Sequence, residues 1–421
     1  MTVVSVPETP KPGRPAVASH LRWLGFGAAV DSLGTGLSTV IVLLYFVRVI
    51  GFDTVSVTVA MSVGAVLGLL TPIPVGQLAD RTGLVGTYVG ALCLRGVGFL
   101  GYAVVDDYAW FFGITVLLMA LETTTSSLQQ SLVAGLLDEA GRVRAMSLVS
   151  AVRNAALGAG TLVGGLALAT DSRLVNASLL AVNGLSFFVF AVVVARLGRW
   201  LNGTGTRSAE PEQEKPTRTK GPPPVLRNLR FLALVGANGL LFLHDSVLNE
   251  LLPLWMVISV GLSPVVMSVL LVVNTALSVG LQILFGRMNG LVSRTRTLLW
   301  TSVALLVVFC ALCVAAGRVP TGPAVAVCAL AVVLLTIAEN VHSVVSWQVS
   351  FEWAPESRRS EYMAAFSMGY GLQRVVGPIF LIGVVLARGD FGWLVLGSVF
   401  ALAGGGFGVL SRRGKGAKPT S

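Results

Sequence analysis

Charged residues are scarce in this chain, and cysteine and histidine are scarcer still. Of its 421 residues only 12% are Asp, Glu, Lys or Arg, whereas 54% are apolar and the mean hydropathy is +0.80. That composition excludes an ordinary soluble globular protein. A membrane-spanning helix needs about 20 mostly apolar residues, and the chain supplies roughly a dozen such runs. We therefore expect an all-α integral membrane protein.

Several features that carry chemistry are also missing. The sequence has no G-x-x-x-x-G-K-[ST] loop for nucleotide phosphates, which argues against direct coupling to ATP. Cys310 and Cys313 have C-x-x-C spacing, but they lie in an apolar run without a His or carboxylate beside them, which favours packing over metal or redox chemistry. Residues 1–20 are polar and proline-rich, so no cleavable signal peptide is expected. We expect no enzyme activity, no metal and no bound cofactor.

The apolar runs form two sets of six, separated by a polar segment. Residues 198–228 are rich in Gly, Pro, Thr, Ser and charges, which predicts a flexible linker. On either side we predict six-helix bundles at 21–197 and 229–411, with tails at 1–20 and 412–421. The predicted spans are 23–49, 54–75, 86–105, 108–134, 146–169, 175–197, 231–257, 264–285, 297–316, 323–349, 362–387 and 391–410.

An internal repeat relates the two halves. Displacing the sequence by 217 residues places Glu122 on Glu339 and Gly160 on Gly377. Repeated helix bundles are a common architecture of secondary transporters. The repeat therefore predicts twelve transmembrane helices in two pseudo-symmetric six-helix bundles.

The basic residues are distributed unevenly between the two sides of the predicted bundles. Loops on the side of the termini and the linker hold 23 of the 30 Lys and Arg residues. Cytoplasmic loops carry an excess of Lys and Arg, so both termini and the linker are expected to be cytoplasmic. This orientation explains the net charge of +10 better than nucleic-acid binding does. The opposite side holds only Arg48, Arg173, Arg318 and Arg388.

A short charged motif follows the second predicted span. Residues 76–83 read GQLADRTG. Here Gly76 would allow close approach of another backbone, Asp80 and Arg81 would form an ion pair, and Gly83 would let the chain turn back. The motif resembles the loop between the second and third helices of the major facilitator superfamily, whose pattern is G-x-L-a-D-r-x-G-r-k.

This resemblance implies a cytoplasmic gate formed by the glycines and charges of the motif together with Arg142. In such a gate Asp80 and Arg81 would contact neighbouring helix ends, namely the 138–144 loop and the start of the eleventh helix, where Asp80 would meet the free N–H groups. The sequence departs from the family pattern at Leu84 and Val85, where basic residues are usual.

Several charged residues lie well inside the predicted spans. A charge at mid-bilayer costs about 2.5–3.5 kcal/mol on insertion scales, so it usually faces a cavity or a partner. Depth along the helices would allow Arg95 to pair with Glu122, and Arg374 with Glu339. These pairs would act either as static links between helices or as proton sites when the arginine moves away. The candidates for proton coupling or the substrate cavity are Asp31, Arg95, Glu122, Arg153, Asp245, Glu339 and Arg374.

The first helix lines the central cavity in the family that the chain resembles. That implies a cavity role for Asp31, as a proton carrier or as an attraction point for a cationic substrate. The alternative is a structural pair with Arg153. Asp245, beside His244, occupies the pseudo-symmetric seventh helix, and His342 shares a helix face with Glu339 as a structural residue or a relay.

Small residues recur in the fifth predicted span, which lets neighbouring helices pack closely. The stretch resembles the G-P-x-x-G-G signature of the drug:proton antiporter branch, with Thr161 in place of proline, and is similar to bacterial macrolide and siderophore exporters. The proline of the signature occurs instead in the second half of the chain. The residues concerned are Gly158, Gly160, Gly164, Gly165, Gly377 and Pro378.

These resemblances imply a secondary transporter that works by alternating access, most concretely a proton-coupled exporter of a drug-like or natural-product molecule. An importer of a small nutrient and a non-transporting sensor on the same fold stay open, although costly membrane charges disfavour the sensor. We expect a monomer in the bacterial cytoplasmic membrane. Its expected partners are a small-molecule substrate, protons and lipid, without nucleic acid, and the proton gradient would be the driving force.

Overall fold

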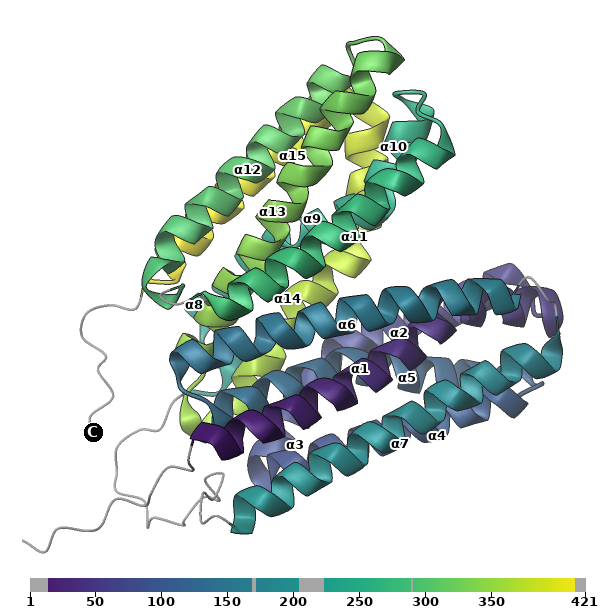
Figure 1. The fold of residues 1–421 in the computed structure, drawn as a ribbon, viewed down its shortest axis with the longest axis vertical. Coiled ribbons are helices and arrows are strands. Elements are labelled where there is room, and N and C mark those ends of the chain that lie inside the picture. Colours follow the sequence, from purple (N-terminus) through teal and green to yellow (C-terminus); the bar gives the residue numbers. More distant parts are fainter. Residues whose placement is uncertain (1–13, 169–171, 204–222, 289–290, 413–421) are drawn as a thin grey trace, which may run out of the picture.

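The computed structural model describes residues 14–168, 172–203, 223–288 and 291–412. In these ranges the regular secondary structure is helical and contains no strand. Helices satisfy every backbone hydrogen bond within one segment, which a lipid environment requires. The helices form two bundles that meet near the ends of the chain and diverge away from them (Figure 1).

The first bundle is built from the N-terminal half of the chain. Its first helix ends in a short π-helical turn, η1, at Tyr45–Val49. The α-helices are α1 (Arg14–Leu44), α2 (Thr54–Leu70), α3 (Pro72–Thr82), α4 (Leu84–Val104), α5 (Tyr108–Leu136), α6 (Glu139–Leu168) and α7 (Arg173–Gly203).

The second bundle repeats this plan with more interruptions. Short 3-10 or π-helical segments are η2 (Val225–Arg227), η3 (Val247–Leu251), η4 (Val292–Arg294), η5 (Glu356–Arg358), η6 (Leu381–Val385) and η7 (Leu386–Arg388). The α-helices are α8 (Leu229–Leu241), α9 (Leu243–Ser246), α10 (Leu252–Ile258), α11 (Pro264–Arg287), α12 (Thr295–Ala316), α13 (Thr321–Trp353), α14 (Arg359–Phe380) and α15 (Asp390–Leu410).

Most of these helices are long and apolar enough to cross a membrane. Within the described residues nine helices meet that condition, and two bent helix pairs bring the number to eleven. The 31-residue α1, which packs along α6 and α7, supplies the remaining crossing. The predicted all-α membrane fold of twelve helices in two bundles is confirmed, and the chain is a multi-pass membrane protein.

Some predicted boundaries differ from the structure. Helix α7 continues to Gly203, so residues 198–203 belong to the bundle and not to the linker. Residues 204–222 lie outside the described part of the chain. The end of the predicted linker is packed, since Val225 is fully buried, and α1 begins at Arg14, inside the predicted tail.

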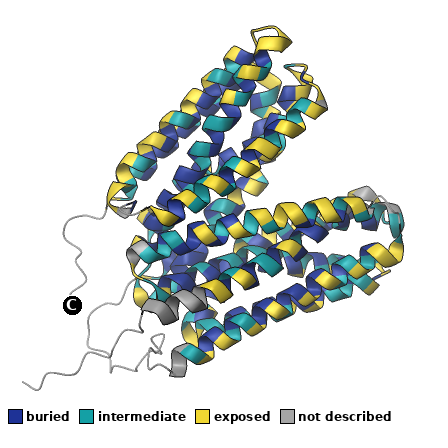
Figure 2. Ribbon diagram, viewed as in Figure 1, coloured by how far each residue is buried: buried dark blue, intermediate teal, exposed yellow. Residues whose placement is uncertain are grey.

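Each bundle has its own apolar core, and buried residues gather inside the bundles while exposed ones lie on their outer faces (Figure 2). Many of the exposed residues are large and apolar, as on a surface that contacts lipid. Helix α14 contributes to both cores. Met363 packs within the N-terminal core, whereas Tyr362 and Phe366 pack within the C-terminal one. A smaller cluster joins Val143 of α6 to Phe285 of α11 at the same junction. In the described part of the chain these packed contacts between the bundles lie where the bundles converge.

Candidate functional site

Asp80, near the end of α3, binds the start of α14 in the opposite bundle. Its two carboxylate oxygens accept hydrogen bonds from the backbone N–H groups of Ser360 and Glu361, each at 3.0 Å. The first N–H groups of a helix have no partner within the helix and carry a partial positive charge, so they suit a carboxylate. The structure thus confirms the predicted contact of Asp80 with the start of the eleventh membrane helix.

The two glycines of the motif have separate roles. A Cβ atom on Gly76 would lie 2.7 Å from the carbonyl oxygen of Ser360, so only glycine lets α3 and α14 approach this closely. Gly83 has φ = +107°, a conformation that L side chains rarely adopt, and it ends α3. The predicted turn over 76–83 is wrong in extent: these residues are helical through Thr82 because Pro72 starts a new helix there.

The arginines of the predicted gate differ in their contacts. The predicted Asp80–Arg81 ion pair is wrong, since both oxygens of Asp80 bind α14 and Arg81 is exposed. Arg142 donates from Nε to the carbonyl oxygen of Leu137 at 2.8 Å. Its guanidinium lies 5.9 Å from the ring centre of Phe351 on α13, so it reaches the opposite bundle.

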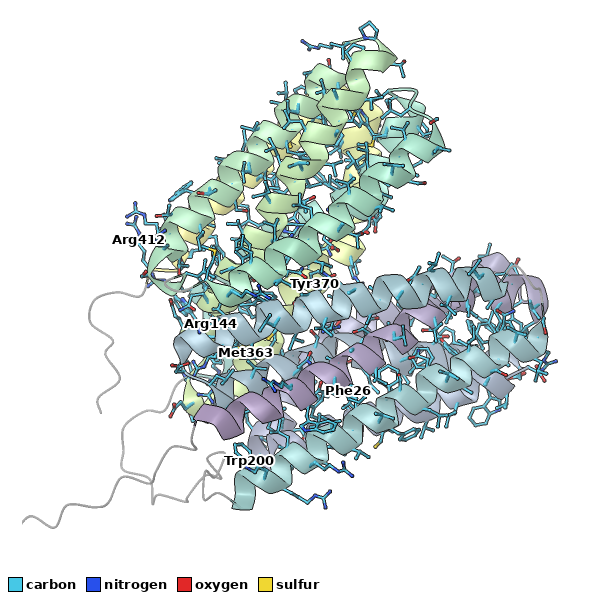
Figure 3. The ribbon with its side chains drawn as sticks, in the orientation of Figure 1. Phe26, Arg144, Trp200, Met363, Tyr370 and Arg412 are labelled. Carbon is cyan, nitrogen blue, oxygen red and sulfur yellow. The ribbon has the colours of Figure 1, made fainter. Side chains whose placement is uncertain are left out.

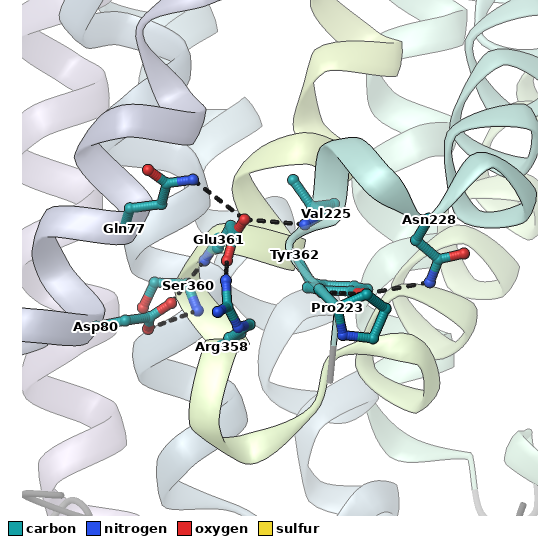
Figure 4. A network of polar contacts seen from close by, with 9 residues as sticks. All are labelled: Gln77, Asp80, Pro223, Val225, Asn228, Arg358, Ser360, Glu361 and Tyr362. Atoms are coloured by element: carbon teal, nitrogen blue, oxygen red, sulfur yellow. Dashed lines mark hydrogen bonds and ion pairs between the residues drawn. The ribbon is translucent and has the colours of Figure 1, made fainter. Parts of the chain in front are cut away.

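Glu361 is a gate residue that the sequence interpretation missed. Its side chain is only 2% exposed, and its Oε1 atom accepts from Gln77 Nε2 at 3.1 Å and from the Val225 N–H at 2.9 Å. Arg358 binds the other oxygen at 2.9 Å. Figure 4 shows this carboxylate between α3, the segment leading into α8, and the start of α14. The feature of the sequence that could have identified it is an acidic residue in the first turn of a helix, where a negative charge is stabilised.

The start of α14 also binds the segment of chain that leads into α8. Tyr362 donates its hydroxyl proton to the carbonyl oxygen of Pro223 at 3.1 Å and accepts from Asn228 Nδ2 at 3.2 Å (Figure 4). The chain that enters the second bundle is therefore attached to α14 beside the contact of Asp80. The gate comprises α3, α14 and this entry segment.

Deeper in the membrane, one ion pair connects the bundles. Glu122 of α5 and Arg374 of α14 are 3.0 Å apart, and their side chains are 42% and 50% exposed. The predicted pairs Arg95–Glu122 and Arg374–Glu339 are both wrong. The position of a charged residue along its helix gives its depth in the membrane. It does not give the face of the helix on which the side chain lies, or the bundle that this face contacts.

Arg95 instead lies within the N-terminal bundle. It donates to Thr125 Oγ1 at 3.0 Å, and its guanidinium lies 4.3 Å from the ring centre of Phe187. Asp31 of α1 is 8% exposed, and its Oδ1 atom has no hydrogen-bond partner among the described residues. The alternative pair of Asp31 with Arg153 is not formed as a hydrogen bond, since Arg153 donates to Gln129 at 3.3 Å.

Asp245 lies on α9 against α14. Its Oδ2 atom accepts from the Tyr370 hydroxyl at 3.3 Å and from Gln373 Nε2 at 3.2 Å. The Arg374 guanidinium is 5.5 Å from the ring centre of Tyr370, which Figure 3 places near the junction of the bundles. Glu122, Arg374, Tyr370 and Asp245 therefore form a continuous polar chain from α5 to α9.

Two buried histidines, His244 of α9 and His342 of α13, contact each other inside the C-terminal bundle. The Nε2 atom of His244 and the Nδ1 atom of His342 are 3.1 Å apart, and both side chains are buried. This contact ties α9 to α13. The contact fits both interpretations of His342, a structural residue or a relay.

Glu339 of α13 lies in a group of neutral polar residues. Its Oε1 atom accepts from Ser278 Oγ at 2.7 Å, from Asn340 Nδ2 at 3.3 Å and from Asn274 Nδ2 at 3.4 Å. Asn274 and Ser278 belong to α11. The group therefore lies between α11 and α13, within the C-terminal bundle.

The glycines of the fifth predicted span, now α6, divide into two sets. A Cβ atom on Gly160 would lie 2.1 Å from the carbonyl oxygen of Leu33, and one on Gly164 would lie 2.4 Å from that of Leu37. These two glycines let α6 pack directly on α1, as predicted. Gly158 and Gly165 were expected to do the same, but a Cβ atom at either would meet nothing within 4 Å, because they face away from α1.

In the second half, Gly377 lies against α9. A Cβ atom there would be 2.5 Å from Ser246 Oγ, so the glycine permits this contact. The side chain of Pro378 lies outside the described part of the structure.

The polar contacts that cross between the bundles form two layers at their junction. The layer nearer the termini contains backbone-capping contacts that close this end, and the deeper one contains charges that remain reachable from solvent. Such an arrangement suits a path whose two ends open alternately. In the part of the chain that the structure describes, no three His, Cys, Asp or Glu side chains gather as metal ligands would.

The family model of the Major Facilitator Superfamily matches residues 24–378. The chain belongs to the Major Facilitator Superfamily, a family of membrane transporters and not of enzymes. No curated protein sequence matches the chain significantly.

Solved structures share the fold at low sequence identity. A bacterial homologue of the iron transporter ferroportin in the outward-facing state is 16% identical, with a TM-score of 0.72 over 94% of this chain and 100% of that chain. The human organic anion transporter MFSD10 (TETRAN) is 16% identical, with a TM-score of 0.67 over 94% and 100%. FucP in the outward conformation is 12% identical, with a TM-score of 0.65 over 94% and 99%.

Proposed function

We propose that this protein is a proton-coupled exporter of a drug-like or natural-product small molecule that works by alternating access. The observation that carries the proposal is the Glu122–Arg374 ion pair, which joins the two bundles deep in the membrane while both side chains stay partly exposed. Charged side chains within the membrane are costly and usually mark a pathway or a switch. The pair is placed to break when the bundles move apart.

The direction of opening follows from the distribution of basic residues. Lys and Arg gather on the side of the termini, which on the positive-inside rule is cytoplasmic. The contacts of Asp80 and Glu361 close that side, and the bundles diverge on the other (Figure 1). This conformation corresponds to an outward-facing transporter, like the bacterial ferroportin homologue and FucP.

Export is supported by the close packing of α1 on α6. Gly160 and Gly164, which resemble the antiporter signature, are the two glycines at which the helices meet. We propose a bacterial cytoplasmic membrane location, a monomeric protein, and lipid, protons and substrate as its partners. Asp31, with an unpartnered oxygen in the N-terminal bundle, is a candidate attraction point for a cationic substrate.

The test uses acidified inside-out vesicles, in which an exporter takes up the added compound and releases protons to the bath. A pH-sensitive dye reports proton release as lipophilic cations and macrolide-like compounds are added. The wild type should respond to at least one compound, and vesicles without the protein should not. Proton-independent uptake of a nutrient by whole cells, without any response in vesicles, would reject the exporter.

The same vesicles test the ion pair. Glu122→Gln should slow transport roughly tenfold or more, because the neutral side chain no longer attracts Arg374 across the junction. Glu356→Gln is the matched control, since that side chain is 89% exposed and its ion pair with Arg359 lies within one bundle. Equal rates for both variants would remove the ion pair from the mechanism.

A further inference from the structure

Glu339 differs from the other carboxyl groups of the membrane interior in the residues that surround it. Its hydrogen-bond partners in the described chain are two amides and a hydroxyl, on Asn274, Asn340 and Ser278. All three bonds fall on Oε1. The side chain is only partly buried, so Oε2 is left for exchange with the surroundings.

Positive charge accompanies the remaining candidates. Glu122 is bonded to Arg374. Arg95 and Arg153 act electrostatically on Asp31, and Arg374 does so on Asp245. A proton that neutralised one of these acids would leave its arginine without a counter-charge inside the membrane, which is most costly for Arg95 because that side chain is buried. Protonation of Glu339 leaves no such charge behind.

The charged and titratable groups that face Glu339 are few. Asp245 of α9 acts on it electrostatically, and among the described residues no Arg or Lys forms a hydrogen bond or an ion pair with Glu339. His342, one turn along α13, is bonded to His244. The residues of α11 that touch Glu339 are neutral.

Helix α11 links this group to the junction of the bundles. Asn274, Ser278 and Gln282 recur every four residues and therefore share one helix face. The first two bind at Glu339, whereas Gln282 accepts from Asn154 of α6 in the opposite bundle at 3.2 Å. Movement of α11 against α6 would thus alter the donors around Glu339.

We propose that Glu339 is the residue that carries the coupled proton, with Asn274 and Ser278 as its positioning residues. In the outward-facing state the carboxylate takes a proton from water at Oε2, while Oε1 keeps its three donors. In the inward-facing state the same O–H bond breaks and the proton passes to cytoplasmic water. This assignment rests on the proposed function and gives Glu122 the separate role of a latch.

The experiment measures two reactions in vesicles, substrate-driven proton release and the exchange of labelled for unlabelled substrate. It compares them between Glu339→Gln and Glu122→Gln. Glutamine keeps an oxygen that accepts as Oε1 does, but it cannot release a proton. Glu339→Gln should therefore lose substrate-driven proton release by roughly tenfold or more while it still exchanges labelled for unlabelled substrate. Retained exchange also shows that the variant is folded. Glu122→Gln should slow both reactions and leave the number of protons per substrate unchanged.

Further outcomes separate this inference from the proposed function. Glu339→Asp, which retains a carboxyl group, should recover part of the proton release, and Ser278→Ala should reduce it. Normal proton release from Glu339→Gln would overturn the inference while leaving the exporter intact. Transport that follows a sodium gradient and not a pH gradient would overturn the choice of the proton as the coupled ion. A wild type without any substrate-driven proton movement would instead reject the proposed function.

Discussion

Asp80 uses both of its oxygens on the first N–H groups of a helix that lies 280 residues further along the chain. Hydrogen bonds to a charged group contribute about 1.5–3 kcal/mol, roughly twice the value for neutral partners. Asparagine at this position would keep one acceptor and lose the attraction to the helix terminus. A single carboxylate thus supplies two charged hydrogen bonds between the bundles.

We expect Asp80→Asn to weaken the gate by about 1–2 kcal/mol, equivalent to a roughly 5- to 30-fold rise in the open population. The measurement is the rate at which an impermeant maleimide labels Ala364→Cys in inside-out vesicles. Ala364 is fully buried against Gly76 when the gate is closed. Glu356→Gln, a neutralised acid on the exposed surface nearby, should leave the rate unchanged, and equal rates for both variants would count against the gate.

Local patterns predicted Asp80 and Gly76 because the motif is contiguous and the start of a helix attracts an anion. Glu361 escaped prediction because its partners Gln77 and Val225 lie 284 and 136 residues away. Glu122 and Arg374 were both predicted as site residues, but each was given the wrong partner. Helix depth fixes one coordinate, and the rotation of each helix about its axis comes only from packing.

At the scale of the helix, the spacing of small residues determines how α1 meets α6. Gly160 and Gly164 are one turn apart and point the same way, and Gly36 of α1 reciprocates, since its Cβ would lie 2.3 Å from the carbonyl oxygen of Leu157. Gly158 and Gly165 lie on other faces of α6. The glycine count predicted close packing, but only the four-residue spacing identifies the glycines that provide it.

Gly160→Val should therefore destabilise the N-terminal bundle, whereas Gly158→Val should be tolerated. Overpacking costs about 1–3 kcal/mol in ordinary cores, and a backbone atom 2.1 Å away cannot move as a side chain would. Thermal unfolding in detergent, followed by size-exclusion chromatography, would show a lower melting temperature for the first variant only. Matching losses in both would mean that helix propensity, and not contact with α1, sets the requirement for glycine.

For the whole molecule, the polar contacts at the two ends of the bundles differ in kind. Asp106 binds Arg173, and Arg318 binds Asp390 at 2.8 Å, each pair within its own bundle at the end away from the termini. At the other end the contacts of Asp80 and Gln77 cross between bundles, and those of Asn154 and Glu122 cross between them at greater depth. At the end away from the termini each bundle is thus tied internally, and the described polar contacts between bundles lie at the closed end or at this deeper layer. This pattern suits two bodies that rock about their junction.

A crosslink between α6 and α11 should hold the protein in the conformation described here. Asn154 and Gln282 are hydrogen-bonded at 3.2 Å across the junction, so cysteines at both positions come within reach of a short, reducible bifunctional reagent. Because the closed side must open for substrate to enter or leave there, the linked protein should lose nearly all transport and regain it on reduction. The assay would use a background without Cys93, the native cysteine that is only partly buried, and Asn154→Cys alone as the control. Full transport by completely crosslinked protein would mean that α6 and α11 stay together throughout the cycle, and the path would then have to open elsewhere.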